Sequence, residues 1–219
     1  MKRLFLLLIF FTACFMIFTY PLATDPAGSF ITDGGDGPLF VWNIYNFSEN
    51  ARELRNPYRT DRIFHPSGSS LIMHTYSPVY GIFGLFTRNP VFALNLALFL
   101  SFIFSALGSF YLSRHYLKND LLSALSGMVF AFAPYKLSHV REHYNLMLTA
   151  TIPFFVLLFV KSFRNSGGVP ALPDKKHAAI AALLLSVTIF SEYYYAAYLL
   201  VFAALYLIYL FSCRQETSP

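Results

Sequence analysis

The sequence predicts an all-α protein whose helices cross a membrane several times. Hydrophobic residues make up 56% of the 219 residues, charged residues make up 12%, and the mean hydropathy is +0.52. Soluble domains carry about 25% charged residues, so a soluble enzyme is disfavoured. Apolar stretches of membrane-crossing length recur along the chain and are separated by polar segments. Together these features predict a polytopic transmembrane helix bundle that forms a single domain over residues 1–219.

The predicted spans follow from counting apolar residues, because a helix needs about 20 of them to cross a bilayer, within a range of about 17–25. We place about six spans, near residues 4–20, 91–112, 121–133, 146–160, 178–190 and 194–211, of which the third, fourth and fifth are shorter than this range. Lys2 and Arg3 precede the first stretch, so a cleaved signal peptide is the rival interpretation. We favour an anchor, because the apolar run exceeds the ~7–15 residues of such peptides. The last two stretches, separated by Ser191-Glu192, could instead form one long hairpin or a tilted pair.

The distribution of basic residues predicts a cytoplasmic N-terminus, because short cytoplasmic segments of membrane proteins are enriched in Lys and Arg. In this topology the short outer segments hold Lys136 and Arg141, and the short inner segments hold nine basic residues: Lys2, Arg3, Arg114, Lys118, Lys161, Arg164, Lys175, Lys176 and Arg214. The net charge of +5 follows this rule and does not indicate binding to nucleic acid. The same topology places the long loop at residues 22–90 outside.

The long loop is expected to contain structure of its own, because unstructured loops beyond about 15 residues are uncommon. Pro38 predicts the first position of a helix, with Gly37 as its cap, that continues to Leu54. Trp42 and the tyrosines near it suit a helix that lies at the membrane interface. Ser77-Pro78 predicts a second interfacial helix that ends near Arg88.

Two aspartates in a glycine-rich part of this loop are candidate catalytic residues. Asp36 is expected directly before a helix N-terminus, whose dipole keeps a carboxylate ionised. Such a carboxylate can act as a general base toward a hydroxyl or hold a divalent cation near a phosphate. Asp33 precedes it by three residues, across Gly34-Gly35, and can converge on the same point. The alternative is a turn with helix-capping acids.

A second polar cluster, residues 138–145, follows the third span and is predicted on the same outer face. His139 and His143 are spaced i,i+4 and would share one face of a helix. Two histidines without a third ligand indicate a metal only weakly, whereas Lys136 and Arg141 beside them favour a phosphate or pyrophosphate subsite. The alternative is a polar connector that faces water. Glu192 and Tyr194 also emerge outward and either line the same cavity or belong to an aromatic belt.

These segments resemble a known family, the bacterial GT-C-type membrane glycosyltransferases. The resemblance to their first periplasmic loop lies in residues 35–43, 56–61, 64–68 and 74–78, which begin Gly35-Asp36-Gly37-Pro38, Asn56-Pro57-Tyr58, Phe64-His65-Pro66 and His74-Thr75-Tyr76. Residues 130–139, with His143 and Asn145, are similar to the end of their third helix and the segment after it. The resemblance covers about residues 25–200 and implies a GT-C-like fold in the bacterial cytoplasmic (inner) membrane, with a role in the cell envelope.

The resemblance also implies an activity. A hexosyl or pentosyl group would move, with inversion, from a polyprenyl-phosphate donor to an acceptor on the outer face. Asp36 or Asp33 would be the base or a ligand of a divalent metal, Mg²⁺ or Mn²⁺. The donor phosphate would be bound by His139, His143, Arg141 and Lys136, and the substrate cavity would include Trp42, Asn43, His74, Glu192 and Tyr194. The expected partners are membrane lipid and the lipid-linked sugar.

The chain departs from that family in length, because its members carry more helices and a soluble C-terminal domain. Three alternatives follow: a natural short form, a partial gene product that is an inactive truncated fragment, or one part of a split enzyme whose partner subunit supplies the missing helices or domain. A non-catalytic subunit that binds or flips a lipid-linked sugar through the same cavity is a further alternative.

Overall fold

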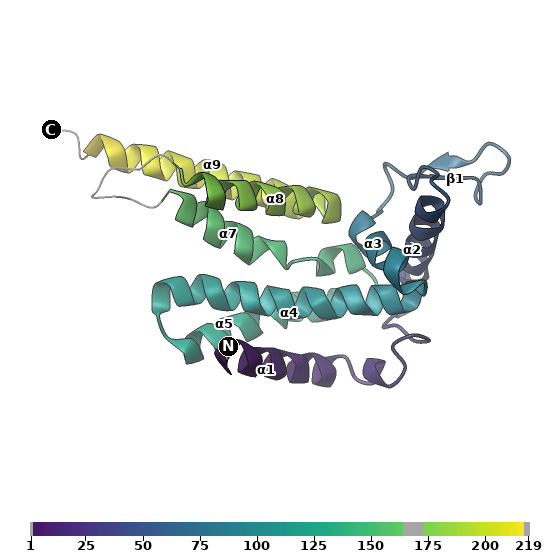
Figure 1. Cartoon of the computed structure of the whole chain (residues 1–219), viewed down its shortest axis with the longest axis horizontal. Coiled ribbons are helices and arrows are strands. Elements are labelled where there is room, and N and C mark those ends of the chain that lie inside the picture. Colours follow the sequence, from purple (N-terminus) through teal and green to yellow (C-terminus); the bar gives the residue numbers. More distant parts are fainter. Residues whose placement is uncertain (1, 164–172, 217–219) are drawn as a thin grey trace. The chain divides into compact units, whose positions relative to one another are not determined.

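The computed structural model describes residues 2–163 and 173–216, with side chains up to residue 212 (Figure 1). Arg164, used above to predict the topology, lies outside the described residues, as does the side chain of Arg214. The chain divides into two compact units. Unit 1 consists of Met1–Ile103 and Ala131–Leu148, and unit 2 of Phe104–Phe130 and Thr149–Pro219.

The described residues confirm the all-α class. The α-helices are α1 (Lys2–Phe18), α2 (Gly37–Arg52), α3 (Pro78–Thr87), α4 (Pro90–Leu117), α5 (Asp120–Ala131), α6 (Pro134–His139), α7 (Thr151–Ser162), α8 (Lys175–Ser191) and α9 (Tyr193–Glu216). Short 3₁₀-helices are η1 (Leu22–Thr24) and η2 (Tyr144–Met147). The strands β1 (Arg59–Thr60) and β2 (Ser69–Ser70) pair antiparallel, with Arg59 opposite Ser70. A helix therefore lies at each predicted span and at both predicted interfacial helices.

Three helical stretches in the described ranges are long and apolar enough to cross a membrane: Pro90–Leu117, Asp120–His139 and Tyr193–Ser212. They coincide with the second, third and last predicted spans. The helices α1, α7 and α8 have 17, 12 and 17 residues, against the roughly 20 that a crossing needs. The chain thus carries candidate membrane-spanning helices, and six crossings remain a prediction.

Two predicted helix starts are wrong. The fourth predicted span begins at residue 146, but α7 begins at Thr151, and η2 precedes it. Pro153 explains the difference, because a proline has no N–H to donate to the carbonyl four residues earlier and is tolerated only in the first turn of a helix. At α2 the N-cap is Asp36, not Gly37, and Pro38 lies in the first turn.

The core of unit 1 is built where α1 packs against the first half of α4. Phe11, Phe15 and Phe102 are buried there, and the Phe15 ring lies 5.4 Å from the Phe102 ring. The side-chain amide of Asn95 on α4 donates to the carbonyls of Pro26 and Ser29, at 2.8 and 2.7 Å. These bonds fix the chain that leaves α1 beside α4.

Within unit 1, α2 stands across the direction of α1 and packs on α3 (Figure 1). Glycines on α3 permit the close contact, because a methyl group on Gly81 would lie 2.3 Å from Cγ of Phe47, and one on Gly84 would lie 2.7 Å from Ile44. Arg52 at the end of α2 donates to the Gly84 carbonyl at 2.6 Å. The pair forms the rigid part of the long loop.

A stripe of three buried asparagines on α2, which we call the asparagine stripe, holds the rest of the loop. Asn43, Asn46 and Asn50 are 4%, 1% and 7% exposed. Asn43 donates to the carbonyl of Thr75 at 3.1 Å, and Asn50 to that of Arg59 at 2.8 Å. Asn46 lies 3.4 Å from the hydroxyl of Tyr76, which itself donates to the Pro57 carbonyl at 2.7 Å. Burial raises the pKa of Tyr76 to about 12, so the hydroxyl stays a donor at neutral pH.

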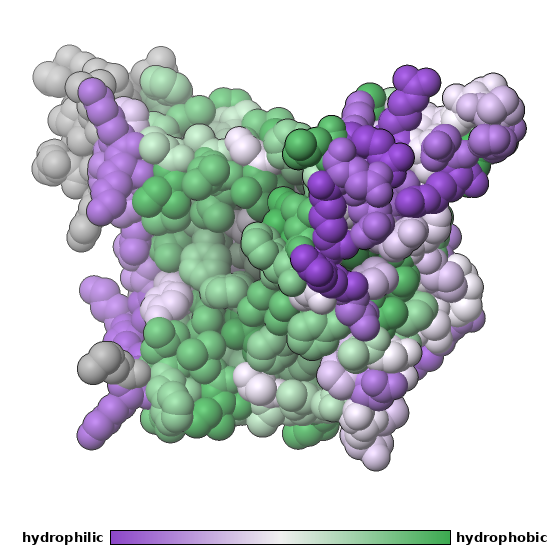
Figure 2. All heavy atoms as spheres, turned by 45° about the vertical axis from the view of Figure 1, so that its right-hand side comes forward, coloured by the Kyte–Doolittle hydropathy of each residue, from purple (hydrophilic) through white to green (hydrophobic). Residues whose placement is uncertain are grey.

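Unit 2 has a core of its own, formed by α7, α8 and α9 around Phe155, Ala181 and Leu199. In the second half of α4 the Ser109 hydroxyl lies 3.0 Å from that of Ser126 on α5. The separation of the last two predicted spans is confirmed, because α8 ends at Ser191 and α9 begins at Tyr193. Figure 2 shows hydrophobic side chains over much of the visible helix surface, and hydrophilic ones over the part that carries α2 and the β-strands.

The glycine contact between α2 and α3 can be tested with Gly81→Ala. Overpacking costs roughly 1–3 kcal/mol, which exceeds the ~1 kcal/mol that alanine gains over glycine in a helix. We expect faster limited proteolysis between α2 and α3, measured in detergent. Ile82→Ala, on the exposed side of the same helix, is the control, and equal cleavage of both variants would contradict the contact.

Candidate functional site

The two polar clusters that the sequence singles out meet in unit 1. Nη1 of Arg141, in the turn after α6, lies 2.9 Å from Oδ1 of Asp33 in the long loop. The two side chains are 58% and 52% exposed. This ion pair joins segments 108 positions apart in the sequence. Asp33 thus contacts a guanidinium that we expected to bind phosphate.

The glycines beside Asp33 let the loop approach this turn closely. A methyl group on Gly35 would lie 2.7 Å from Oε1 of Glu142, so the Glu142 carboxylate lies against the loop backbone. Gly34 has φ +99°, a conformation that side chains rarely adopt, and its N–H donates to the Thr32 hydroxyl at 3.0 Å. Gly34 therefore permits the backbone conformation of the turn, and Gly35 permits the close approach of the loop to Glu142.

Asp36 is exposed at the N-terminus of α2, as predicted, but its side chain makes no capping hydrogen bond. The negative charge of its carboxylate influences the pKa of His74. Burial lowers the pKa of His74 below the ordinary value, and the negative charge of Asp36 opposes that shift. The buried Nε2 of His74 and Oδ1 of Asn43 find no hydrogen-bond partner among the described residues. Such atoms are usually satisfied by water or a ligand.

His139 and His143 lie together, although not on one helix. α6 ends at His139, and the two rings are 5.4 Å apart across the following turn. The N–H of His143 donates to the His139 carbonyl at 2.9 Å. The same turn carries Arg141, so three of the four predicted phosphate-binding residues occupy one segment.

The fourth, Lys136, is placed differently from an exposed phosphate ligand. Its side chain is 2% exposed, and Nζ lies 4.1 Å from the centre of the Phe102 ring. Nζ also lies 3.3 Å from the Ser101 hydroxyl. Lys136 therefore belongs to the core of unit 1, where α6 meets α4.

The remaining predicted cavity residues divide between the units. Trp42 is partly exposed and Asn43 is buried, both on α2 in unit 1. Glu192 and Tyr194 belong to unit 2, where Glu192 is 4% exposed and accepts from the N–H of Tyr194 at 3.2 Å. Tyr194 is 59% exposed.

Tyr144 anchors residues 31–36, which we call the aspartate loop. Its hydroxyl donates to the Ile31 carbonyl, and its own carbonyl accepts from the Tyr80 hydroxyl at 2.6 Å. The Tyr144 ring lies edge-on to Phe40, 5.4 Å away. Burial raises the pKa of Tyr144 well above its ordinary value, so the hydroxyl remains a donor. α2, α3 and the aspartate loop all converge on this residue.

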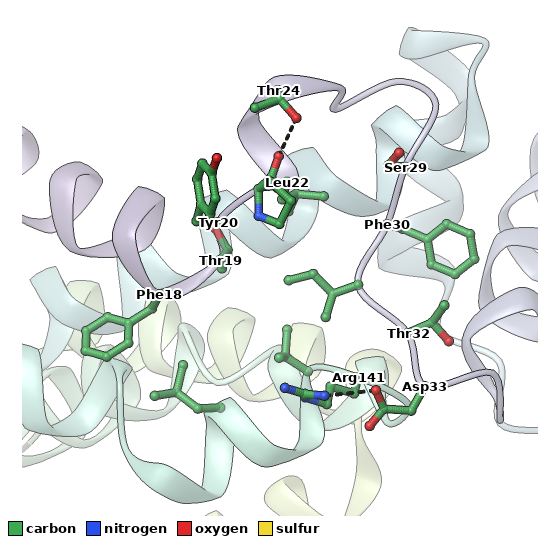
Figure 3. A pocket seen from close by; sticks show the side chains of 14 residues that line it. Phe18, Thr19, Tyr20, Leu22, Thr24, Ser29, Phe30, Thr32, Asp33 and Arg141 are labelled. Atoms are coloured by element: carbon green, nitrogen blue, oxygen red, sulfur yellow. Dashed lines mark hydrogen bonds and ion pairs between the residues drawn. The ribbon is translucent and has the colours of Figure 1, made fainter.

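A cavity of about 440 Å³, which we call the α1 cavity, opens beside the ion pair (Figure 3). Figure 3 shows the end of α1 on one side, the loop that leads to Asp33 on the other, and Arg141 pointing toward Asp33. The cavity is lined by Phe18, Thr19, Tyr20, Pro21, Leu22, Thr24, Ser29, Phe30, Ile31, Thr32, Asp33, Leu137, Val140 and Arg141. The lining mixes apolar side chains, such as Phe18, Leu22 and Ile31, with hydroxyl-bearing ones, and the ion pair lies at the side. A lining of this kind can take an amphipathic molecule that has an anionic group.

The side chains that the structure describes do not form a metal site of three protein ligands. No group of three or more His, Cys, Asp or Glu side chains is placed to hold a cation within residues 2–163 and 173–212. Asp33 contacts a guanidinium, which competes with any cation for its oxygens. Mg²⁺ is commonly held by only one or two carboxylates together with substrate phosphates and water, so the expected Mg²⁺ or Mn²⁺ stays a prediction.

Sequence reasoning missed several features of the site. Tyr144 stands in the predicted polar cluster, yet nothing in the pattern showed that it would reach Ile31. Glu142 is likewise in that cluster, and only the fold brings it to Gly35. The asparagine stripe could have been found, because Asn43, Asn46 and Asn50 recur at i, i+3 and i+7, the spacing of one helix face.

Comparison with known proteins adds no relative: no family model, no curated protein and no solved structure matches the chain.

The Tyr144 anchor can be tested with Tyr144→Phe, which removes the hydroxyl and keeps the ring. The Ile31 carbonyl then loses its donor, at a cost of about 1–3 kcal/mol. We expect faster amide hydrogen exchange in residues 31–36, measured by mass spectrometry. Tyr45→Phe, which keeps the exposed ring beside Arg62, should leave that exchange unchanged, and equal effects of the two variants would argue against the anchor.

The coupling of His74 to Asp36 predicts the sign of a pKa change. Asp36→Asn removes the charge that opposes burial, so the pKa of His74 should fall further below its value in the unchanged protein. Because folding lowers this pKa, the associated stability is present above the unfolded value of about 6.5 and is lost as the pH falls below it. NMR of ¹³C-labelled histidine measures the titration, and Glu49→Gln is the control. An unchanged or raised pKa in Asp36→Asn would contradict the coupling.

Proposed function

We propose that this chain is the membrane portion of a glycosyltransferase of the GT-C type. It would move a sugar from a polyprenyl-phosphate donor to an acceptor on the outer face of a bacterial cytoplasmic membrane, with its N-terminus in the cytoplasm. The candidate membrane-spanning helices support a site at a bilayer. The sequence resemblance given above supports the reaction class.

One observation carries the proposal. Arg141 and Asp33 bring the two predicted clusters together beside the α1 cavity, with Asp36 three residues further along the loop. Within this mixed lining, the apolar side chains of Phe18, Leu22 and Ile31 suit the first units of a polyprenyl chain, and the guanidinium suits its phosphate. The proposal thus places the lipid phosphate in the cavity that Asp33 lines, and the base, Asp36, on the same loop.

In the reaction that we propose, Arg141 binds the donor phosphate. A guanidinium makes paired, charge-assisted hydrogen bonds to phosphate oxygens. The Asp33 carboxylate would give up its contact, or share the guanidinium, when the anionic phosphate enters. His143 is exposed in the same turn, and we propose that it contacts the same phosphate. These groups would stabilise the charge that the leaving phosphate acquires.

Asp36 is the proposed general base. It accepts the proton of the acceptor hydroxyl while that oxygen forms a bond to the anomeric carbon. The bond from the anomeric carbon to the phosphate oxygen breaks, and polyprenyl phosphate leaves with the bonding electron pair. Attack opposite the leaving group inverts the anomeric centre. Nε2 of His74 and Oδ1 of Asn43, which have no hydrogen-bond partner among the described residues, are the groups that we propose to orient sugar hydroxyls. No step uses a metal.

The test is turnover in proteoliposomes. Mass spectrometry of lipid that co-purifies with the protein identifies the donor, and release of polyprenyl phosphate is then measured with that lipid. Because general-base catalysis contributes typically 10²–10⁴-fold, Asp36→Asn should slow release by about 10²-fold or more and leave lipid binding intact. Asp33→Asn should change the apparent affinity for the donor more than the maximal rate.

Glu49→Gln, which removes only the surface pair with Arg52, is the control and should behave like the unchanged chain. Full turnover in Asp36→Asn would refute the assignment of the base. The unchanged chain could instead bind lipid without turnover, and replacing either aspartate could leave that binding unchanged. Such a result would support a non-catalytic subunit that binds or flips the lipid-linked sugar.

A further inference from the structure

A second pocket lies in the long loop, at the end of α2 away from Asp36. Its volume is about 260 Å³, and we call it the hairpin pocket because β1 and the turn between β1 and β2 form one side. The lining residues are Asn50, Arg55, Asn56, Arg59, Thr60, Asp61, Pro66, Ser67 and Gly68. It shares no residue with the α1 cavity.

The backbone around this pocket is firmly held. Asn50, 7% exposed, donates to the Arg59 carbonyl at 2.8 Å and belongs to the asparagine stripe. Gly68 has φ +69°, and a methyl group there would lie 2.6 Å from the Thr60 carbonyl oxygen. The turn between the strands can therefore close against β1 only with glycine at this position.

The charge of the pocket suits an anion. Arg55 and Arg59 line it, against the single carboxylate of Asp61. Arg55 also pairs with Glu53, but both side chains of that pair are about half exposed, at 52% and 53%. Exposed pairs of this kind exchange readily for a stronger partner. Hydroxyl and amide groups from Thr60, Ser67 and Asn56 can add hydrogen bonds to phosphate oxygens.

Large apolar side chains project into solvent at both edges of the pocket. Leu54, directly before Arg55, is 96% exposed, and Phe64, two residues before Pro66, is 77% exposed. Both have a left-handed backbone, with φ 56° and 54°, which is uncommon for bulky residues. Met73, just after β2, is 95% exposed. Figure 2 shows hydrophobic atoms among the hydrophilic ones in this part of the surface.

The orientation of α2 determines what these side chains can meet. α2 stands across α1 in unit 1 (Figure 1). If α1 runs along the membrane normal, α2 and the hairpin that follows it extend along the membrane surface. Apolar side chains beside arginines are the pattern of segments that lie in the interface, with the apolar groups buried and the basic groups at lipid phosphates.

We propose that the hairpin pocket binds the phosphate of an anionic phospholipid headgroup, while Leu54 and Phe64 insert into the interface of the same leaflet. Arg55 and Arg59 contact the phosphate. The contact anchors the far end of α2 to the bilayer and fixes the height of the Asp36 end above it. This proposed lipid site is independent of the transferase reaction, so either proposal can be refuted without the other.

The experiment uses the full chain in nanodiscs, with Cys14 and Cys213 replaced by alanine. A fluorophore on Phe64→Cys reports quenching by lipids brominated in the acyl chain. We expect quenching at this position, stronger by about twofold or more when phosphatidylglycerol replaces part of the phosphatidylcholine. A fluorophore on Ser70→Cys, at an exposed polar position of β2, is the matched control and should be quenched little.

Arginine variants identify the pocket. Arg55→Gln with Arg59→Gln should abolish the dependence on phosphatidylglycerol, and Arg88→Gln, an exposed arginine of the same loop outside the pocket, should keep it. Arg55→Lys with Arg59→Lys should retain part of the dependence, which shows that the glutamine pair does not act through misfolding. Absence of quenching at position 64 in either lipid, or quenching that the glutamine pair leaves unchanged, would overturn the proposal.

Discussion

The asparagine stripe of α2 is the interaction on which the long loop depends. Between α2 and α3 the chain has only short strands, so many of its backbone carbonyls need donors from elsewhere. A buried carbonyl without a donor costs about 1–3 kcal/mol. The amides of Asn43 and Asn50 satisfy the carbonyls of Thr75 and Arg59, and Tyr76, which Asn46 contacts, satisfies that of Pro57. A helix face that would ordinarily be apolar is polar here because its partner is irregular backbone.

This arrangement makes α2 a rigid spacer between two polar regions. Asp36 stands at its start and Asn50, which lines the hairpin pocket, lies fourteen residues later, or about 21 Å along the axis at 1.5 Å per residue. Tyr144 fixes the Asp36 end within unit 1 through Phe40 and the Ile31 carbonyl, and the glycine contacts with α3 hold the middle of the helix. A lipid contact at the far end would therefore set the height of the aspartate relative to the bilayer, because no flexible segment separates the two.

The sequence predicted the helices better than the site. Apolar counts and the prolines at 38 and 78 located the helices, because length and the missing N–H act locally. The Asp33–Arg141 pair crosses 108 positions, and no local pattern encodes such a contact. Lys136 shows the same limit of local patterns. Its position three residues before His139 predicted an exposed residue on the outer face, but in the structure Lys136 is buried against the Phe102 ring. The start of α7 was wrong only because Pro153 was not weighed.

Within unit 1, the side chains that hold the aspartate loop in place differ from those that we propose to bind the ligand. The groups that hold the aspartate loop are buried hydroxyls: those of Tyr144 and Tyr80 donate to backbone carbonyls. Burial raises the pKa of Tyr144, so its hydroxyl remains a donor at neutral pH. The Asp33–Arg141 pair is more than half exposed, and exposed pairs contribute only about 0–1 kcal/mol. A ligand phosphate can thus take Arg141 from Asp33 at little cost while the loop keeps its position. A buried ion pair in the same place would have tied ligand entry to local unfolding.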